Sequence, residues 1–221
     1  MIVPGIHDGH DSGATLLKDG KDMIVSVEER RRNIKNYVGV PEQSLHALFD
    51  RTGIRPQDVD LIALSGLVRT TPPTSGYKPM YGVLGIGYRL AKGQAATSAG
   101  RWVLSKMRKR HDLMKFLGEM GLGDKPIVPY DHHLTHAACA YYHKPWDGKT
   151  LVLTVDGAGD GLCATVSVGE GYELKRIART PKYHSVAAWM YSFITGYLGM
   201  KISEHEYKVM GMAPYGQAER V

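Results

Sequence analysis

Three histidines lie within five positions of one stretch, YDHHLTHAACAYY, at residues 130–142. If this stretch is helical, His132 and His136 stand four residues apart on one face, where their two imidazoles can bind the same divalent metal ion. Asp156, further along the chain, is a plausible third ligand that would add an oxygen. The spacing leaves a second pairing open, because His133 and His136 are three residues apart. For each histidine the alternative is a structural role in the core, with its ring nitrogens hydrogen-bonded to other protein groups.

A second group of ionisable side chains follows the first expected strand, in HDGHDSGAT at residues 7–15. Loops at strand ends collect binding and catalytic groups because a rigid sheet positions them within reach of a ligand. His10 beside Asp11 could act as a general base, since imidazole titrates near neutral pH and the carboxylate can orient it. The alternative is a solvated polar turn in which aspartate and serine cap the next element.

The segment VDGAGDG, residues 155–161, ends an apolar strand with an aspartate and three glycines. Glycines such as Gly157 and Gly159 let backbone N–H groups approach a phosphate closely. Asp156 or Asp160 could hold a cation beside it. The alternative is a hairpin turn of type I′ or II′, for which this composition is typical.

The segment EHEYKVMGMAPYG, residues 204–216, mixes charged and apolar residues without a helical or strand period. Lys208 could bind a phosphate as a point charge, with a glutamate such as Glu206 controlling it. Gly211 lies in the flexible Met-Gly-Met part. The alternative is a surface salt bridge beside a helix cap.

The elements that must position these groups alternate between strands and helices, which predicts an α/β fold with a mixed sheet. Asp19–Gly20 is a strong hairpin signal. Residues 67 to about 123 lose the pattern and are interpreted as an insertion that includes a basic amphipathic helix. No internal repeat of fixed period is evident. The other expected elements are a helix in 41–53, strands in 58–66 and 125–131, a helix in 133–144, three strands in 150–180 and a helix in 185–199.

The bulk composition is that of an ordinary globular protein, with 43% hydrophobic and 23% charged residues. The net charge of +6 permits anionic partners such as phosphates, nucleotides or nucleic acid. The two cysteines form no metal-binding or disulfide pattern, which is typical of reduced thiols. The sequence has no signal-peptide pattern and no apolar run long enough to span a membrane. These features predict a cytoplasmic protein without a membrane partner.

Six motifs together resemble one family, the NodU/CmcH-type O-carbamoyltransferases, which include the nodulation, cephamycin and nebramycin carbamoylating enzymes. Any one of the motifs is weak, but all six occur in that family's order and spacing. They are GHDSGATLL, EERRRNIK, DHHLTHAACAYY, VDGAGDG, SVAAWMYSFITGYLG and EHEYKVMGMAPYG.

The resemblance implies an actin-like, ribonuclease-H-like lobe of an ASKHA (Kae1-like) ATPase, with a mixed sheet and a helical insertion. In such enzymes two lobes clasp a nucleotide and a metal ion. ATP and carbamoyl phosphate give carbamoyl adenylate, and the carbamoyl group then passes to a hydroxyl of a small acceptor such as a sugar or an antibiotic.

The resemblance also implies roles for residues of this chain. His132, His136 and Asp156 would bind iron or a similar divalent ion. His10, with Asp11 beside it, would match the histidine that deprotonates the acceptor hydroxyl. The segments that would line the nucleotide and carbamoyl site contain Gly157, Gly159, Asp160, Glu206, Lys208 and Gly211.

The chain departs from the family in length, because family members are far longer than 221 residues. We expect residues 1–221 to be the N-terminal lobe alone, with the second lobe and a YrdC-like C-terminal domain supplied by the same or another chain. A tRNA threonylcarbamoyl-transfer protein is an alternative with the same core, although the EYKVMGMAPYG segment favours a small-molecule acceptor and makes nucleic acid an unexpected partner. A nucleotide-sensing domain that has lost the active half is the non-enzymatic alternative.

Overall fold

The computed structural model describes residues 1–66, 111–202 and 204–217 of the 221-residue chain. The chain divides into two compact units, Met1–Thr135 and His136–Val221. The boundary falls inside one continuous helix, α5 (His132–Tyr142). Most of the predicted insertion, residues 67–110, lies outside the described residues. Within the described ranges, no helix combines the length and the apolar character needed to cross a bilayer.

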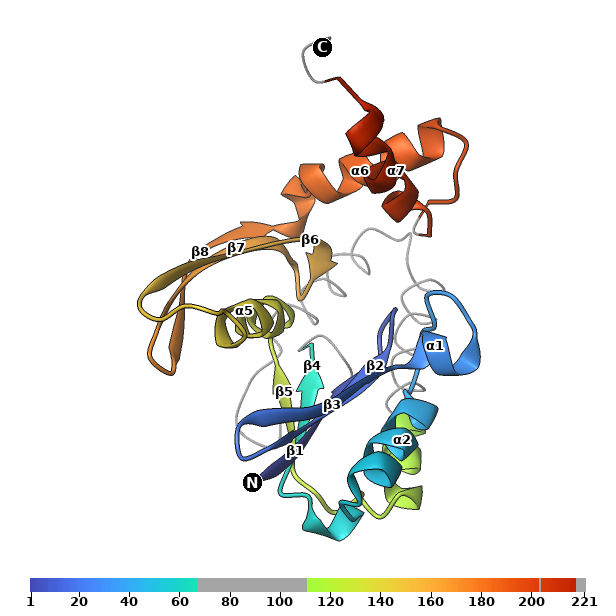
Figure 1. Ribbon diagram of the computed structural model, residues 1–221, viewed down its shortest axis with the longest axis vertical. Coiled ribbons are helices and arrows are strands. Elements are labelled where there is room, and N and C mark those ends of the chain that lie inside the picture. Colours follow the sequence, from blue (N-terminus) through green and yellow to red (C-terminus); the bar gives the residue numbers. More distant parts are fainter. Residues whose placement is uncertain (67–110, 203, 218–221) are drawn as a thin grey trace, which may run out of the picture. The chain divides into compact units, whose positions relative to one another are not determined.

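The first unit is built on a five-stranded mixed sheet. Its strands are β1 (Ile2–His7), β2 (Gly13–Lys18), β3 (Lys21–Val27), β4 (Ile62–Ser65) and β5 (Ile127–Tyr130). The strand order is β3-β2-β1-β4-β5, in which β1 to β3 form an antiparallel meander and β4 and β5 continue from β1 as parallel strands (Figure 1). This arrangement confirms the predicted mixed α/β fold.

The turn between β2 and β3 has the geometry that the sequence predicted. The φ angles of Asp19 and Gly20 are 52° and 76°. Two successive positive values define a type I′ turn, whose twist matches that of the flanking strands. The hairpin prediction at this position is therefore confirmed.

The core of the first unit lies between the sheet and two helical segments, α2 (Glu42–Thr52) and residues 111–119. Alternate residues of β1, β2 and β4 face this core, as expected for a half-buried sheet. The segment that ends the predicted insertion also contributes to the core. The buried apolar residues from these helices and their flanking turns include Leu45, Leu48, Phe49, Leu113, Phe116, Leu117 and Leu122.

A buried glutamate in the short helix α1 (Glu28–Arg32) caps the start of α2. Its Oε1 accepts hydrogen bonds from Arg32 Nε at 2.7 Å and from the Gln43 N–H at 3.1 Å, and its Oε2 accepts one from the Ser44 N–H at 2.8 Å. The first N–H groups of a helix have no partner within the helix itself. Here the cap comes from a residue about fifteen positions upstream, because the residue that precedes α2 is a proline.

The second unit contains an antiparallel three-stranded sheet with the order β6-β7-β8. Its strands are β6 (Thr150–Gly159), β7 (Leu162–Glu170) and β8 (Glu173–Pro181), and its helices are α6 (Val186–Tyr197) and α7 (Glu206–Met212). Short 3-10 turns cover Pro56–Asp58 in the first unit and Lys182–His184 and Ala213–Tyr215 in the second.

The part of α5 that belongs to the second unit packs against this sheet. Ala137 and Tyr141 form a small buried cluster with Val152 of β6, and Leu174 of β8 packs against it. The Tyr141 hydroxyl donates a hydrogen bond to the Gly171 carbonyl at 3.0 Å. The helix is therefore held on the sheet by both apolar contact and a hydrogen bond.

A glycine on β7 is required for this close packing. A Cβ atom at Gly169 would overlap the ring of Tyr141. We expect Gly169→Ala to lower the free energy of unfolding of the second unit by about 1–3 kcal/mol, the usual cost of overpacking a filled core. Urea denaturation measures this change. Gly118→Ala is the control, because that helical glycine has open space around it and its replacement should stabilise by about 0.5–1 kcal/mol.

Both units contain the same succession of structures. Each contains an antiparallel three-strand meander, β1 to β3 in the first unit and β6 to β8 in the second, and an Asp-Gly pair stands near the end of the first strand of each meander. An aspartate with positive φ follows in the turn, Asp11 at 54° and Asp160 at 49°. An Ala-Thr pair then lies in the second strand of each meander. The loops differ in length, so this similarity has no fixed sequence period.

Candidate metal centre and catalytic loop

Helix α5 begins at His132, which places two of the three histidines on one helical face. The cap is Asp131, whose Oδ1 accepts a hydrogen bond from the Leu134 N–H at 2.8 Å. His132 and His136 therefore both lie within the helix, four residues apart, and the helix begins one residue before its expected start at position 133.

Asp156 is presented by an irregularity in β6. The register pairs Val155 with Ala164 and then Gly159 with Leu162, so three residues of β6 stand opposite one residue of β7. Such bulges change the direction in which a side chain points and are common near functional sites. The Gly157 N–H donates a hydrogen bond to Asp156 Oδ1 at 2.6 Å. This bond holds one carboxylate oxygen and directs the other elsewhere.

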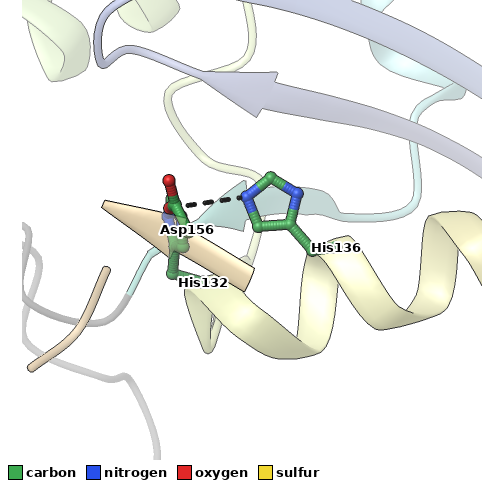
Figure 2. Close-up of side chains that lie close together, drawn as sticks. All are labelled: His132, His136 and Asp156. Atoms are coloured by element: carbon green, nitrogen blue, oxygen red, sulfur yellow. Dashed lines mark ion pairs between the residues drawn. The ribbon is translucent and has the colours of Figure 1, made fainter. Parts of the chain in front are cut away.

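His132, His136 and Asp156 form a group of potential metal ligands. One ligand atom from each lies within 4.8 Å of the other two, and His136 Nε2 is 3.8 Å from Asp156 Oδ2 (Figure 2). Two ligands that bind one ion at about 2.1 Å are roughly 3–3.5 Å apart. Two imidazole nitrogens and a carboxylate oxygen suit iron, zinc and similar divalent ions. The residues therefore fit a metal ion with only small adjustments of the side chains.

His133 lies apart from this group and inside the protein. Its side chain is fully buried, and its ring meets the His132 ring edge to face with the centroids 5.5 Å apart. Of the two pairings that the sequence left open, the structure thus brings His132 together with His136 and Asp156.

The loop between β1 and β2 carries the predicted general base. His10 Nδ1 and Asp11 Oδ2 are 2.9 Å apart, and both side chains are exposed. A carboxylate only accepts hydrogen bonds, so Nδ1 is the donor, and in the neutral imidazole Nε2 then has the lone pair. This is the tautomer that a base needs if its Nε2 is to take a proton from a substrate hydroxyl.

Backbone hydrogen bonds fix the far end of this loop. The Ser12 N–H donates to the Tyr37 carbonyl at 3.2 Å, and the Glu28 N–H donates to the Ser12 carbonyl at 2.9 Å. The Arg32 guanidinium, which pairs with Glu28, lies 5.0 Å from the centre of the Tyr37 ring. The capping glutamate and the loop between β1 and β2 therefore belong to one connected set of contacts.

The glycine-rich segment of β6 and β7 forms a hairpin turn. Asp160 and Gly161 have φ angles of 49° and 85°, which define a type I′ turn. A Cβ atom at Gly157 would meet nothing within 4 Å. The backbone at Gly157 is thus open to approach by a ligand, beside the proposed ligand Asp156.

The remaining predicted residues lie on α7. Glu206 Oε1 accepts a hydrogen bond from the Ser192 hydroxyl of α6 at 3.0 Å. Lys208 is exposed, with its Nζ 5.9 Å from the centre of the Tyr207 ring. Gly211 is also exposed. α7 therefore presents a cation and a glycine to its surroundings while Glu206 ties it to α6.

Glu28 lies in the EERRRNIK motif, but the motif alone assigned it no role. The available signal was the spacing of Glu28 and Arg32, since a glutamate four residues before an arginine pairs on a helix. The same carboxylate also reaches the N–H groups of α2. This contact depends on how α1 and α2 pack together, which the spacing does not show.

Comparison with known proteins places the chain in a family. Residues 3–221 match the family model described as Carbamoyltransferase N-terminus. An uncharacterized protein of Synechocystis, sll1178, is 32% identical over 219 residues, which cover 96% of this chain and 34% of the relative. The nodulation protein NolNO of Sinorhizobium fredii is 30% identical over 207 residues, which cover 94% of this chain and 28% of the relative.

The chain spans about a third of the length of these curated relatives. Among solved structures, YeaZ from Pseudomonas aeruginosa is similar with a TM-score of 0.40 and 13% identity, over 82% of this chain and 68% of YeaZ. The family model covers nearly every residue, including the histidine cluster and the loop after β1. The chain belongs to the carbamoyltransferase family and corresponds to its N-terminal part.

Proposed function

We propose that this chain is the N-terminal part of an O-carbamoyltransferase that transfers a carbamoyl group from carbamoyl adenylate to a hydroxyl of a small molecule. The observation that carries the proposal is the ligand set of His132, His136 and Asp156 in a member of the carbamoyltransferase family. Carbamoyl adenylate would be formed from ATP and carbamoyl phosphate by further domains, in the same or another chain, that correspond to the remaining length of the relatives.

In this mechanism His10 Nε2 takes the proton of the acceptor hydroxyl as its oxygen attacks the carbamoyl carbon. The bond between that carbon and the phosphate oxygen breaks, and AMP leaves. Asp11 accepts the Nδ1–H of His10 at 2.9 Å and so stabilises the imidazolium that forms. The chain itself thus supplies the base and the group that orients it.

A divalent ion, iron or similar, held by His132, His136 and Asp156 would polarise the carbamoyl carbonyl and neutralise charge on the leaving phosphate. The glycine-rich turn would lie along the nucleotide phosphates, through Gly157, Gly159 and Asp160. Lys208 would add a positive charge there, and Glu206 and Gly211 belong to the same segment as Lys208. These assignments rest on the residue chemistry and the family membership.

Metal binding by the chain alone tests the ligand set. We expect the wild-type chain to bind cobalt or zinc, used as stable probes, and His136→Ala to weaken that binding by more than the roughly 10–100-fold that loss of a supporting partner costs. Isothermal titration measures the affinity, and cobalt absorption reports the coordination.

His143→Ala is the matched control for this measurement. His143 is an exposed histidine that directly follows the same helix, and its Nδ1 bonds the Cys139 carbonyl at 2.8 Å. Its replacement should leave the affinity unchanged. Equal affinity in the His136 variant and the wild type would exclude His136 as a ligand.

Carbamoyl transfer itself must be measured in a complete enzyme, meaning this chain continued by the remaining two-thirds of the Synechocystis relative. Radiolabelled carbamoyl phosphate, ATP and a panel of sugars and aminoglycosides would reveal the acceptor. Labelling of a small-molecule hydroxyl supports the proposal. Labelling of tRNA alone would instead identify a threonylcarbamoyl-transfer protein, and nucleotide binding without any transfer would identify a sensing domain.

A further inference from the structure

We propose that His7 is a positioning residue that holds the pair His10 and Asp11 in the geometry a general base needs. This inference rests on the role proposed above for His10. His7 is the last residue of β1, and it pairs across the hairpin with Gly13, the first residue of β2. It therefore stands where the rigid sheet ends and the loop begins.

The side chain of His7 spans its own loop. Its Nε2 lies 3.0 Å from the carbonyl oxygen of His10, and the two rings meet edge to face with the centroids 6.4 Å apart. A carbonyl only accepts hydrogen bonds, so Nε2 is the donor. An imidazolium would make the same bond, which means that the contact does not require one protonation state of His7.

The bond matters because the next residue has an uncommon backbone conformation. Asp11 has a φ of 54°, in the left-handed region that residues with a side chain adopt only rarely. Contacts elsewhere must therefore hold the turn. The Ser12 N–H and carbonyl are fixed on one side of Asp11, and the His10 carbonyl is fixed by His7 on the other.

The chain contains a natural comparison for this pair. His111 and Asp112 form the same dipeptide, and their side chains are 77% and 52% exposed, against 76% and 51% for His10 and Asp11. Yet the distance from Nδ1 to the carboxylate oxygen is 3.8 Å between His111 and Asp112 and 2.9 Å between His10 and Asp11. Adjacency in sequence and equal exposure do not bring the groups into a hydrogen bond. The held, left-handed turn does so at Asp11.

Two substitutions separate the hydrogen bond from the bulk of the ring. In His7→Gln the amide nitrogen can occupy the place of Nε2 and still donate to the His10 carbonyl. In His7→Leu the volume is similar but no donor remains. His111→Leu, at an exposed histidine outside this loop, is the control for loss of a histidine in general.

The first readout is NMR of the 221-residue chain, which requires no activity. Backbone chemical shifts distinguish a left-handed residue from a right-handed one, and the heteronuclear NOE reports local order. We expect His7→Leu to remove the left-handed signature of Asp11 and to loosen residues 9–11. We expect His7→Gln and His111→Leu to keep both. Unchanged shifts and order in His7→Leu would overturn the proposal.

The second readout is carbamoyl transfer by the complete enzyme. We expect His7→Leu to lower kcat for transfer by about 100-fold, as misplacement of a reacting group can, with adenylate formation and the acceptor KM unchanged. His7→Gln should recover most of the loss. Equal loss in both variants would overturn the proposal. If His7→Leu is fully active and His10→Ala is inactive, the proposal for His7 is refuted but the proposed base His10 is not. If His10→Ala is fully active, the proposed base itself is refuted.

Discussion

Replacing His10 by alanine in the complete enzyme is expected to lower carbamoyl transfer by about 10²–10⁴-fold, the usual contribution of a positioned general base. The acceptor hydroxyl then has no group to take its proton as it attacks the carbamoyl carbon. Formation of carbamoyl adenylate should continue, because that step does not use the hydroxyl. Release of pyrophosphate, measured beside transfer of the labelled carbamoyl group, separates the two steps.

His111→Ala is the matched control, since it removes an equally exposed histidine that also precedes an aspartate. Its transfer rate should equal that of the wild type. The Asp11→Asn variant adds a finer test, because its amide oxygen can still accept the Nδ1–H but bears no charge to stabilise the imidazolium. An intermediate loss is expected there. Unchanged transfer in His10→Ala would show that another group acts as the base.

Replacing Glu28 by alanine is expected to lower the free energy of unfolding of the first unit by about 3 kcal/mol, near the lower end of the cost of breaking a buried ion pair. The carboxylate is fully buried and accepts hydrogen bonds from the Gln43 and Ser44 N–H groups and from the Arg32 guanidinium. Its removal would take this acceptor away from all three donors. Arg32 keeps its contact with Glu42 at 2.6 Å, which limits the loss. Chemical denaturation measures the change.

The stability due to Glu28 should also depend on pH. Burial alone would raise the pKa of the Glu28 carboxyl, but hydrogen bonds from Arg32 and from the Ser44 and Gln43 N–H groups outweigh it and lower the pKa. A folded-state pKa below the unfolded value of about 4.3 means that the stabilisation is present above that pH. It is lost as the pH falls from there through the folded-state pKa.

Glu28→Gln tests this pH dependence, and Glu119→Ala controls for loss of a surface carboxylate. The difference in stability between wild type and Glu28→Gln should be constant above about pH 5 and should shrink below about pH 4.3. Glu119 is exposed and lies 3.7 Å from Lys115, so its loss should change stability by less than about 1 kcal/mol. A difference that does not vary with pH would mean that Glu28 keeps an ordinary pKa.

The helix that contains the histidines, α5, shows which features of the site the local sequence can predict and which it cannot. Spacing alone placed His132 and His136 on one face, because helical periodicity is a local property. The Asp131 cap is local too, and it confirms that the helix includes His132. Spacing could not distinguish His132 from His133 as the partner of His136. The structure brings His132 close to His136 and Asp156 and buries His133, and both placements depend on the elements that pack around the helix.

The sequence by itself determined most of the strands and helices, the hairpin at Asp19–Gly20 and the residue types available for chemistry, since these depend on neighbours along the chain. Helix α7 is an exception, because it forms in a segment that has no helical period. Only the tertiary structure decided which of these residues meet. The approach of Asp156 to His136 at 3.8 Å requires a bulge in β6 and a helix packed on that sheet. The capping of α2 by Glu28 requires two helices to pack together. Contacts between residues distant in sequence are set by packing of the whole unit, and no local pattern encodes them.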